Sequence, residues 1–377
     1  ETTSSAAIYG MLKSSLLFYK KLCKDLIEIG FVINPYDQCV ANRVIEGKQQ
    51  TVTYHVDDLK SSHVDPKVND KFLQWLEMKY GDAEIGKVKA VRGKRHDYLA
   101  MILDYSFPGV VKVDMTNYVK QMVEDFPEQV QNSTYPWNEN LFKVDSQSAR
   151  LSSERAEQFH TFVAKGLFVC KRARQDIQPA IAFLATRVQS PTHSDWFKLK
   201  KLMGFLKSTG DDVLTLDASS RGTIVWRVDA AFGVHPDLKS HTGATMSLGK
   251  GVIQSVSTKQ KVNSRSSTEA ELVSADDVIS KVLWTKLFLE AQGCKVKDNV
   301  IYRDNQSSMK LEQNGKASSG KRTRHFNIKY FYITDLIEKK KVSIKYCPTD
   351  DMIADYMTKP LTGAKFVKFR RMIMNLP

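Results

Sequence analysis

Four acidic residues in the last third of the chain have the settings of a metal site. Asp229 ends one predicted strand, Asp304 ends another, and Asp355 lies in a late helical stretch. Glu269 falls in the first turn of a long predicted helix, with Glu271 as its close rival. Clustered carboxylates repel one another, so they need cations nearby, and Mg²⁺ takes oxygen ligands. Two such ions about 4 Å apart can activate a water and stabilise the leaving oxygen of a phosphodiester.

Each of these acids also has a structural explanation. Asp229 could cap a turn, Asp304 could cap the helix that follows it, and Glu269 could lie on a solvated helix face. Asp355 could pair with Lys359, four residues further along a helix. Four acids from four separate elements are nevertheless what two-metal nuclease chemistry needs.

The choice between Glu269 and Glu271 depends on the helical wheel of the segment that begins near Ser266. Glu269 falls on the same side as Leu272 and Val273, whereas Glu271 points the other way. The wheel is apolar on more than one side, so it tilts the choice toward Glu269 without deciding it.

The elements around these acids predict a mixed α/β domain with one central sheet. We expect its strands at 224–228, 242–248, 252–257, 300–303 and 342–346, and its helices from about 266, at 326–339 and at 350–357. The segment Gly249-Lys250-Gly251 supplies the turn of a hairpin.

The first two thirds of the chain mix strands and helices. We expect helices at 8–29, from Asp65-Pro66 onward and at 116–125, and strands at 39–45, 51–56, 98–105 and 110–113. Residues 127–153 are polar and contain two prolines, so they are the best linker candidate. Residues 154–208 have helical periodicity, with breaks near Pro179 and Pro191.

The net charge of +14 favours a polyanionic partner. No apolar run approaches the roughly 18 to 20 residues that span a bilayer, so we expect nucleic acid and no membrane. The five cysteines are scattered without a Cys-x-x-Cys pair. Neither a disulfide framework nor a zinc site is therefore expected, and a reducing intracellular setting fits the chain best.

Two basic segments are candidates for nucleic-acid contact. The helix that ends near residue 208 carries Lys198 and Lys201 among aromatic residues, and this face could lie along a phosphate backbone. A solvated lysine face is the more common explanation of such a pattern. The second candidate is the glycine-, serine- and Arg/Lys-rich segment 316–329.

The order and spacing of four segments resemble the ribonuclease H domain of copia-type LTR retrotransposons. These segments are Val228-Asp229-Ala230-Ala231, Ser264-Arg265-Ser266-Ser267-Thr268-Glu269-Ala270-Glu271, Tyr302-Arg303-Asp304-Asn305 and Ala354-Asp355-Tyr356-Met357-Thr358-Lys359-Pro360-Leu361. The resemblance implies that Asp229, Glu269, Asp304 and Asp355 bind Mg²⁺ or Mn²⁺. Arg324-His325-Phe326-Asn327-Ile328 resembles the family's basic-His segment. Lys321, Arg322, Arg324 and His325 are candidates for contact with nucleic acid, although a structural or surface role is more common for a single histidine.

The first part of the chain is similar to the reverse transcriptase of the same family. Tyr54-His55-Val56-Asp57-Asp58 resembles its Tyr-Val-Asp-Asp palm motif, and Ile8-Tyr9-Gly10-Met11-Leu12-Lys13 resembles its Leu-Tyr-Gly-Leu-Lys segment. By this resemblance Asp57 and Asp58 would hold Mg²⁺ for nucleotidyl transfer, although turns also favour Asp for backbone reasons. Two features depart from the family: His55 stands where Tyr is usual, and the palm strand with a further metal-binding Asp is not in this chain.

The sequence thus predicts an α/β (α+β) protein with three regions. A partial polymerase palm would occupy 1–126, a helical thumb or connection region 127–220, and a ribonuclease H-like domain with a mixed sheet 221–377. The expected substrates are an RNA–DNA hybrid and, for the intact parent polyprotein, a template-primer with dNTPs. The expected location is a cytoplasmic virus-like particle or the nucleus. The alternative is a degenerate or domesticated remnant that binds nucleic acid without cutting it.

Overall fold

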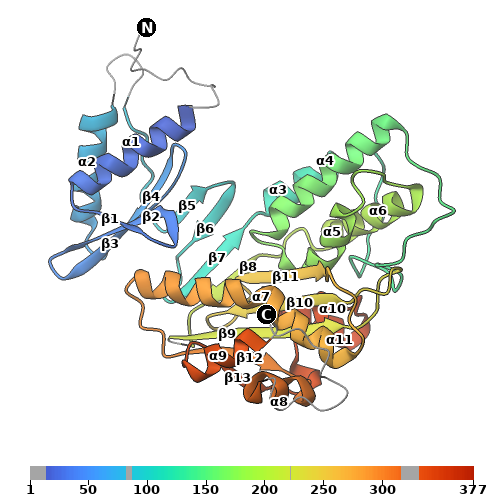
Figure 1. The fold of residues 1–377 in the computed structure, drawn as a ribbon. Helices are drawn as coiled ribbons and strands as arrows, with labels where there is room; N and C mark the ends of the chain where they lie inside the picture. Colours follow the sequence, from blue (N-terminus) through green and yellow to red (C-terminus); the bar gives the residue numbers. More distant parts are fainter. Residues whose placement is uncertain (1–13, 82–86, 221, 316–330) are drawn as a thin grey trace, which may run out of the picture. The chain divides into compact units, whose positions relative to one another are not determined.

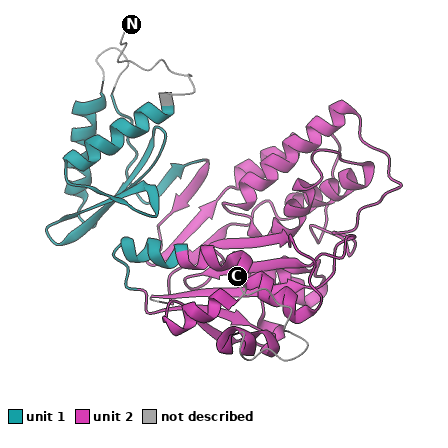
Figure 2. Cartoon of the chain, in the orientation of Figure 1, with its two compact units in different colours: residues 1–99, 284–295 teal, residues 100–283, 296–377 magenta. Residues whose placement is uncertain are grey.

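A computed structural model of the protein describes residues 14–81, 87–220, 222–315 and 331–377. The chain forms two compact units (Figure 2). Unit 1 comprises residues 1–99 with 284–295, and unit 2 comprises residues 100–283 with 296–377. The predicted region boundaries after residues 126 and 220 do not coincide with this division, and the three-region scheme stays a prediction.

Unit 1 contains the antiparallel sheet β1-β2-β3-β4, of which β5 is not a member, with two helices packed against it (Figure 1). Its elements are α1 (Ser14–Glu28), β1 (Val32–Asn34), β2 (Asp37–Ile45), β3 (Lys48–His55), β4 (Asp58–Ser62), α2 (Pro66–Tyr80) and β5 (Arg95–Tyr98). Leu22 and Leu26 of α1 and Phe72 of α2 bury their side chains in one core with Val52 of β3. The predicted helix start is confirmed, because Asp65 accepts a hydrogen bond from the Lys67 amide and Pro66 opens α2.

The first part of unit 2 is a helical layer beside a three-stranded meander. Its elements are β6 (Met101–Asp104), β7 (Val110–Asp114), α3 (Thr116–Glu124), α4 (Ser153–Cys170), α5 (Gln178–Ala185), α6 (His193–Ser208) and β8 (Leu214–Asp217). The segment before α4, predicted as a linker, contains no helix or strand up to Ser152 but is not a free connection. Trp137, Leu141 and Phe142 are buried in the core. The free energy gained by burying these large apolar side chains holds the segment there despite the polar residues between them.

The second part of unit 2 contains the central mixed sheet that the sequence predicts. The strand order is β11-β10-β9-β12-β13, with bounds β9 (Thr223–Ala231), β10 (His241–Ser247), β11 (Gln254–Lys259), β12 (Asp298–Arg303) and β13 (Ser343–Tyr346). β9 pairs antiparallel with β10 and parallel with β12. The register joins Arg227 to Tyr302, so Asp229 and Asp304, each two residues further along, come to the same edge. The mixed α/β fold class is confirmed.

The helices of this part are α7 (Ser267–Ala291), α8 (Gln306–Asn314), α9 (Tyr332–Glu338), α10 (Asp355–Thr358) and α11 (Gly363–Met374). The predicted helix at 350–357 is in fact a 3-10 turn at Thr349–Asp351 followed by the short α10. The sequence patterns do not predict α11. Its buried Phe369 and Ile373 lie in the same core as side chains of α4, α5 and α6.

A buried ion network also joins α11 to the helical part. The Arg370 guanidinium lies 2.9 Å from the carboxylate of Asp176, which Arg174 contacts at the same distance. Asp176 is fully buried, so two guanidinium groups compensate its charge where water cannot. Packing is therefore continuous across residue 220.

Among the helices in the described part of the chain, none is both long enough and apolar enough to cross a bilayer.

Candidate active site

Three carboxylates from three elements converge in unit 2. Asp229 lies in β9, Glu271 near the start of α7, and Asp304 directly after β12. One ligand oxygen from each lies within 4.8 Å of the others. Within the described part of the chain, no other group of three His, Cys, Asp or Glu side chains meets this criterion. The parallel β9–β12 pair and the helix across it thus produce a carboxylate cluster.

The glutamate in this cluster is Glu271 and not Glu269, which the sequence favours. Glu269 lies at the start of α7, where its carboxylate accepts a hydrogen bond from the Arg265 amide at 2.6 Å. The Glu269 amide in turn donates to the Ser266 hydroxyl, 3.1 Å away. Ser266 and Glu269 are three residues apart, which is the spacing of a capping box. That spacing is the signal in the sequence for a structural role of Glu269.

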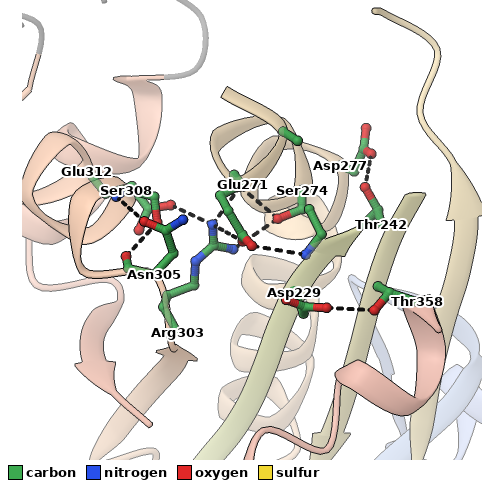
Figure 3. Close-up of polar contacts among 12 residues, drawn as sticks. Asp229, Thr242, Glu271, Ser274, Asp277, Arg303, Asn305, Ser308, Glu312 and Thr358 are labelled. Carbon is green, nitrogen blue, oxygen red and sulfur yellow. Dashed lines mark hydrogen bonds and ion pairs between the residues drawn. The ribbon is translucent and has the colours of Figure 1, made fainter. Parts of the chain in front are cut away.

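Glu271 is held in place by a buried arginine (Figure 3). Arg303, with no exposed surface, lies with its guanidinium 3.0 Å from Glu271 Oε2 and 3.3 Å from Glu312 Oε1 of α8. It also donates to the Ser274 hydroxyl at 3.0 Å. The other oxygen of Glu271 accepts from the Ala230 amide at 3.3 Å. Sequence patterns do not reveal the Arg303–Glu312 pair, because burial of both charges follows from the packing of α8.

Asp229 is fixed by the short helix α10. The Thr358 hydroxyl donates to Asp229 Oδ2 at 2.6 Å (Figure 3). Gly243 is the cross-strand neighbour of Asp229 on β10. A Cβ at position 243 would lie 2.5 Å from the Thr358 methyl and 2.9 Å from the Ala354 carbonyl oxygen. A glycine is therefore needed here for α10 to approach the sheet and contact Asp229.

Asp304 is available to the cluster because its neighbour caps the next helix. The Asn305 side chain accepts the Ser308 amide at 3.0 Å, so Asn305 and not Asp304 is the N-cap of α8. Asp304 Oδ2 accepts from the Thr349 hydroxyl at 3.0 Å. The capping role considered for Asp304 therefore belongs to Asn305.

Asp355 lies beside the cluster, held by two lysines. Lys359 Nζ is 2.6 Å from Asp355 Oδ1 and 3.6 Å from Asp229 Oδ2, and Lys365 Nζ is 2.7 Å from Asp355 Oδ2. The alternative of an i, i+4 pair with Lys359 is thus present in the structure. Asp355 is a neighbour of Asp229, but the group of three does not include it.

Burial makes ionisation of Glu271 and Asp229 costly. Desolvation raises the pKa of Glu271 to about 8 and that of Asp229 to about 6, with Arg303 and Lys359 opposing these shifts. Burial also acts against ionisation of Asp355, but the Lys359 and Lys365 ammonium groups hold its pKa below the usual range. Added positive charge would therefore stabilise the ionised forms of Glu271 and Asp229.

The donor set fits a hard divalent cation. All three members are carboxylates, the ligands that Mg²⁺ prefers, and no softer sulfur or imidazole ligand stands in this group of described residues. Glu271 Oε2 is buried and forms no hydrogen bond with the described residues, although Arg303 lies beside it. Such a carboxylate oxygen can accept a metal ion without giving up a hydrogen bond.

Asp57 and Asp58 lie in unit 1, on the turn between β3 and β4. His55 pairs with Asp58 across this hairpin, and both carboxylates are exposed. Val56 has φ of 55°, which is strained for a β-branched residue. The two acids line a hollow of about 430 Å³ together with Arg92 and His96. No third metal ligand joins them among the described residues.

The predicted basic residues have different surroundings. The Lys198 ammonium donates to the carbonyl oxygens of Leu141 (3.0 Å) and Lys143, so it holds the chain segment before α4. Lys201 lines a shallow hollow of about 460 Å³ together with Lys200. The remaining predicted residues lie outside the described part of the chain: Lys321, Arg322, Arg324 and His325. Contact of the six basic residues with nucleic acid stays a prediction.

The sequence is similar to polyproteins of transposable elements. It is 28 % identical over 193 residues to the retrovirus-related Pol polyprotein from transposon TNT 1-94 of Nicotiana tabacum, covering 51 % of the chain and 14 % of that protein. Identity to the corresponding polyprotein from transposon RE2 of Arabidopsis thaliana is 31 % over 202 residues, which is 53 % of the chain and 14 % of that relative. The transposon Ty1-MR1 Gag-Pol polyprotein of Saccharomyces cerevisiae is 22 % identical over 373 residues, 94 % of the chain and 21 % of that polyprotein. The chain thus spans a small part of these relatives.

Among solved structures, the chain is similar to a foamy viral protease-reverse transcriptase in complex with an RNA/DNA hybrid. The TM-score is 0.49 at 12 % identity, over 91 % of this chain and 39 % of that one. No family model matches the chain.

Proposed function

From the premise that the homologues of this chain are Pol polyproteins of copia- and Ty1-type retrotransposons, we propose that it carries a ribonuclease H activity. The reaction is hydrolysis of the RNA strand of an RNA–DNA hybrid, dependent on Mg²⁺ or Mn²⁺. The observation that carries the proposal is the cluster of Asp229, Glu271 and Asp304. It joins three of the four segments whose order and spacing resemble the family's nuclease.

The three carboxylates would bind the metal, with Asp355 as an outer acid. A divalent cation held there would promote ionisation of a bound water and stabilise the leaving 3′ oxygen of the cleaved phosphodiester. The protein residues keep the ligands in position: Arg303 holds Glu271, and Thr358 holds Asp229. Because these supports are buried, the ligands need little reorganisation when the metal enters.

Because of Lys359, we give Asp355 a role that differs from that of the three clustered acids. Its ammonium lies near both Asp355 and Asp229 and partly balances their charge. Asp355 thereby holds the Lys359 ammonium beside the cluster. A metal ion bound at Asp355 would have to compete with this ammonium. We therefore assign Asp229, Glu271 and Asp304 as the inner ligands.

The test is cleavage of an RNA–DNA hybrid labelled on its RNA strand, by the full chain, with Mg²⁺ and with EDTA. We expect cleavage with Mg²⁺, none with EDTA, and none for Asp304→Asn with an unchanged fold. Activity that survives Asp304→Asn would overturn the site assignment. Salt-sensitive binding without any cleavage by the wild-type chain would instead identify a nucleic-acid-binding remnant.

For unit 1 we propose a part of a polymerase palm, active in RNA-directed DNA synthesis within the intact polyprotein. The exposed Asp57 and Asp58 on a hairpin turn beside a hollow support this proposal. The substrates would be a template-primer and dNTPs. Replacing both residues with Asn in the parent polyprotein should abolish primer extension and leave hybrid cleavage intact. Extension by the double variant would contradict the assignment.

A further inference from the structure

The short helix α10 is held against the central sheet at both ends of one cross-strand row. Gly243 of β10 pairs with Asp229 of β9 on one side and with Ser257 of β11 on the other. Residues directly opposite each other on neighbouring strands share a face of the sheet, so these three form a row on one face. At one end of the row, Asp229 accepts a hydrogen bond from the Thr358 hydroxyl at 2.6 Å. At the other end, the Ser257 hydroxyl donates to the Met357 carbonyl oxygen at 2.8 Å.

Helix α10 cannot keep this position by its own hydrogen bonds. It has four residues, and the last carbonyl groups of a helix lack partners within that helix. An isolated helix of this length is also unstable in water. The Met357 carbonyl oxygen therefore needs a donor from outside α10, and the Ser257 hydroxyl supplies it. Because Met357 precedes Thr358, this bond fixes the peptide next to the hydroxyl that donates to Asp229.

A buried histidine behind Ser257 fixes the direction of its hydrogen bond. His241 Nε2 lies 2.8 Å from the Ser257 hydroxyl oxygen. A carbonyl oxygen only accepts, so the single hydroxyl proton of Ser257 goes to Met357, and the hydroxyl oxygen accepts the proton on His241 Nε2. The neutral His241 ring then has a bare Nδ1, which accepts from His235 Nε2 at 2.9 Å. These four residues form one directed set of hydrogen bonds, which we call the histidine–serine network.

The histidine–serine network is shielded from water. None of His235, His241 and Ser257 is more than 7 % exposed. The Phe142 ring lies against both imidazoles, with its centroid 4.7 Å from that of His241 and 5.2 Å from that of His235. Water therefore has little access to replace a lost donor, and loss of the Ser257 hydroxyl would leave the Met357 carbonyl oxygen without its partner.

Two buried histidines have a simpler explanation, which is that the imidazoles satisfy each other in the core. That explanation accounts for the contact between His235 and His241. It does not require the network to end on α10, one residue before the hydroxyl that holds Asp229. Nor does it account for Gly243 in the middle of the row, where a Cβ would lie 2.5 Å from the Thr358 methyl. The row is thus shaped to receive α10 between its two hydrogen bonds.

We propose that Ser257, oriented by His241, is a positioning residue of the carboxylate cluster, because it holds α10 where Thr358 donates to Asp229 (Figure 3). This inference rests on the proposed function for the metal ion that Asp229 would bind. The position of α10 itself does not depend on a metal. The same helix begins at Asp355, so a loosened α10 would displace the outer acid as well.

Hydrogen exchange of the full chain in EDTA reports the position of α10 without any metal. The Met357 and Lys359 amides donate within this turn, to the carbonyl oxygens of Ala354 and Asp355. Ser257→Ala should therefore speed the exchange of these two amides. The matched control is a substitution in the core of α3, Val119→Ala, which leaves a cavity but no unpaired carbonyl. Its α10 amides should exchange as in the wild type.

Two substitutions at one histidine separate orientation from packing. His241→Leu offers no donor to Ser257, whereas the amide of His241→Gln can donate from near the place of the imidazole Nε2. We expect fast exchange of the α10 amides for His241→Leu and slower exchange, closer to the wild type, for His241→Gln. This pair decides the question in the same way if Ser257→Ala does not fold.

Binding of Mn²⁺, followed by paramagnetic resonance, extends the test to the cluster. Residues that support metal ligands typically change metal affinity by about 10- to 100-fold, so we expect a loss of about 10-fold or more for Ser257→Ala. Thr358→Val removes the donor to Asp229 directly and should weaken binding as well. If Ser257 acts through Thr358, the double variant should bind little more weakly than Thr358→Val alone.

Unchanged exchange of the α10 amides in Ser257→Ala would overturn the inference, and so would equally fast exchange in Val119→Ala. Additive losses of Mn²⁺ affinity for Ser257→Ala and Thr358→Val would overturn it too.

The inference and the proposed function can fail separately, because exchange in EDTA requires neither metal nor cleavage. A wild-type chain that binds no Mn²⁺ and never cuts, but shows the expected exchange pattern, would contradict the nuclease and support the positioning of α10. A chain that cuts, while Ser257→Ala keeps wild-type exchange and Mn²⁺ affinity, would do the reverse.

Discussion

At the scale of single residues, the structure places Glu271, and not Glu269, beside Asp229 and Asp304. The sequence identifies Asp229 and Asp304 as candidates, because an acid at the end of a strand is visible in the pattern. It does not decide the glutamate, since α7 is apolar on more than one side and its orientation is set by packing. The capping-box spacing of Ser266 and Glu269 is the available signal.

The position of Glu271 in the carboxylate cluster gives a direct prediction. Glu271→Gln should lower hybrid cleavage by at least about 100-fold, because the proposed metal ligand loses its charge. Glu269→Gln should keep cleavage near the wild-type rate and lower the free energy of unfolding by about 0.5–1 kcal/mol, since only a helix cap is weakened. Single-turnover cleavage and urea denaturation measure the two effects. The reverse pattern would restore Glu269 as the ligand.

The buried pair behind Glu271 gives a second prediction. Burial raises the pKa of Glu312 to about 7, although Arg303 opposes the shift. Arg303→Met leaves two buried acids without their cation and should destabilise the protein by about 3–5 kcal/mol. Glu312→Leu leaves the Arg303 guanidinium its other carboxylate partner, Glu271, so it should destabilise the protein less than Arg303→Met does. Chemical denaturation of both variants measures the difference, and equal destabilisation would contradict this account of the pair.

At the scale of elements, local patterns predict most of what the structure contains. The β2–β3 hairpin, the start of α2 and the strands of the central sheet follow from alternation, turn chemistry and capping. The packed segment before α4 and the helix α11 do not follow in this way. In both, the buried side chains find their partners far away in the sequence, as Phe366 does with Trp137 at 5.7 Å between ring centroids.

The strand β10 and the loop before it hold a buried histidine pair with a consequence for pH. His235 Nε2 lies 2.9 Å from His241 Nδ1, and His241 Nε2 lies 2.8 Å from the Ser257 hydroxyl. Burial lowers the pKa of His241 to about 3 and that of His235 to about 4, and the charge of a protonated His235 would lower the pKa of His241 further. Both rings are therefore neutral in the folded protein at neutral pH.

The sign of the pH effect follows from these values. Between pH 6.5 and about 3 the unfolded chain binds a proton that folded His241 does not, so stability is lost as the pH falls through this window. The decrease should be on the order of a few kcal/mol. His241→Asn should flatten the dependence of the unfolding free energy on pH. Equal pH dependence in the wild type and His241→Asn would contradict the prediction.

At the scale of the whole molecule, unit 2 unites two regions that the sequence separates. One core includes side chains from 113–214 together with Ile353, Tyr356, Phe366 and Phe369. The change from helical periodicity to strand patterns suggests a boundary near residue 220, but such patterns do not reveal which apolar faces meet.

This shared core predicts cooperative unfolding of unit 2. Phe369 has no exposed surface, and Phe369→Ala should lower the free energy of unfolding by about 3–5 kcal/mol. Because α11 packs on the helical part, the helices and the central sheet should lose structure in one transition. Hydrogen exchange of α5 and β10 amides measures this, and faster exchange confined to residues 221–377 would contradict it.

The Arg370–Asp176 contact also has an evolutionary consequence. Recombination with a related sequence that joins a foreign C-terminal segment at residue 220 would separate the buried Asp176 carboxylate from Arg370, one of its two cations. Chimeras should therefore be viable only when Asp176 and Arg370 come from the same parent, as they do when the crossover lies outside the interval between them. The central-sheet part of unit 2 should therefore be exchanged together with the helices before it, as one block.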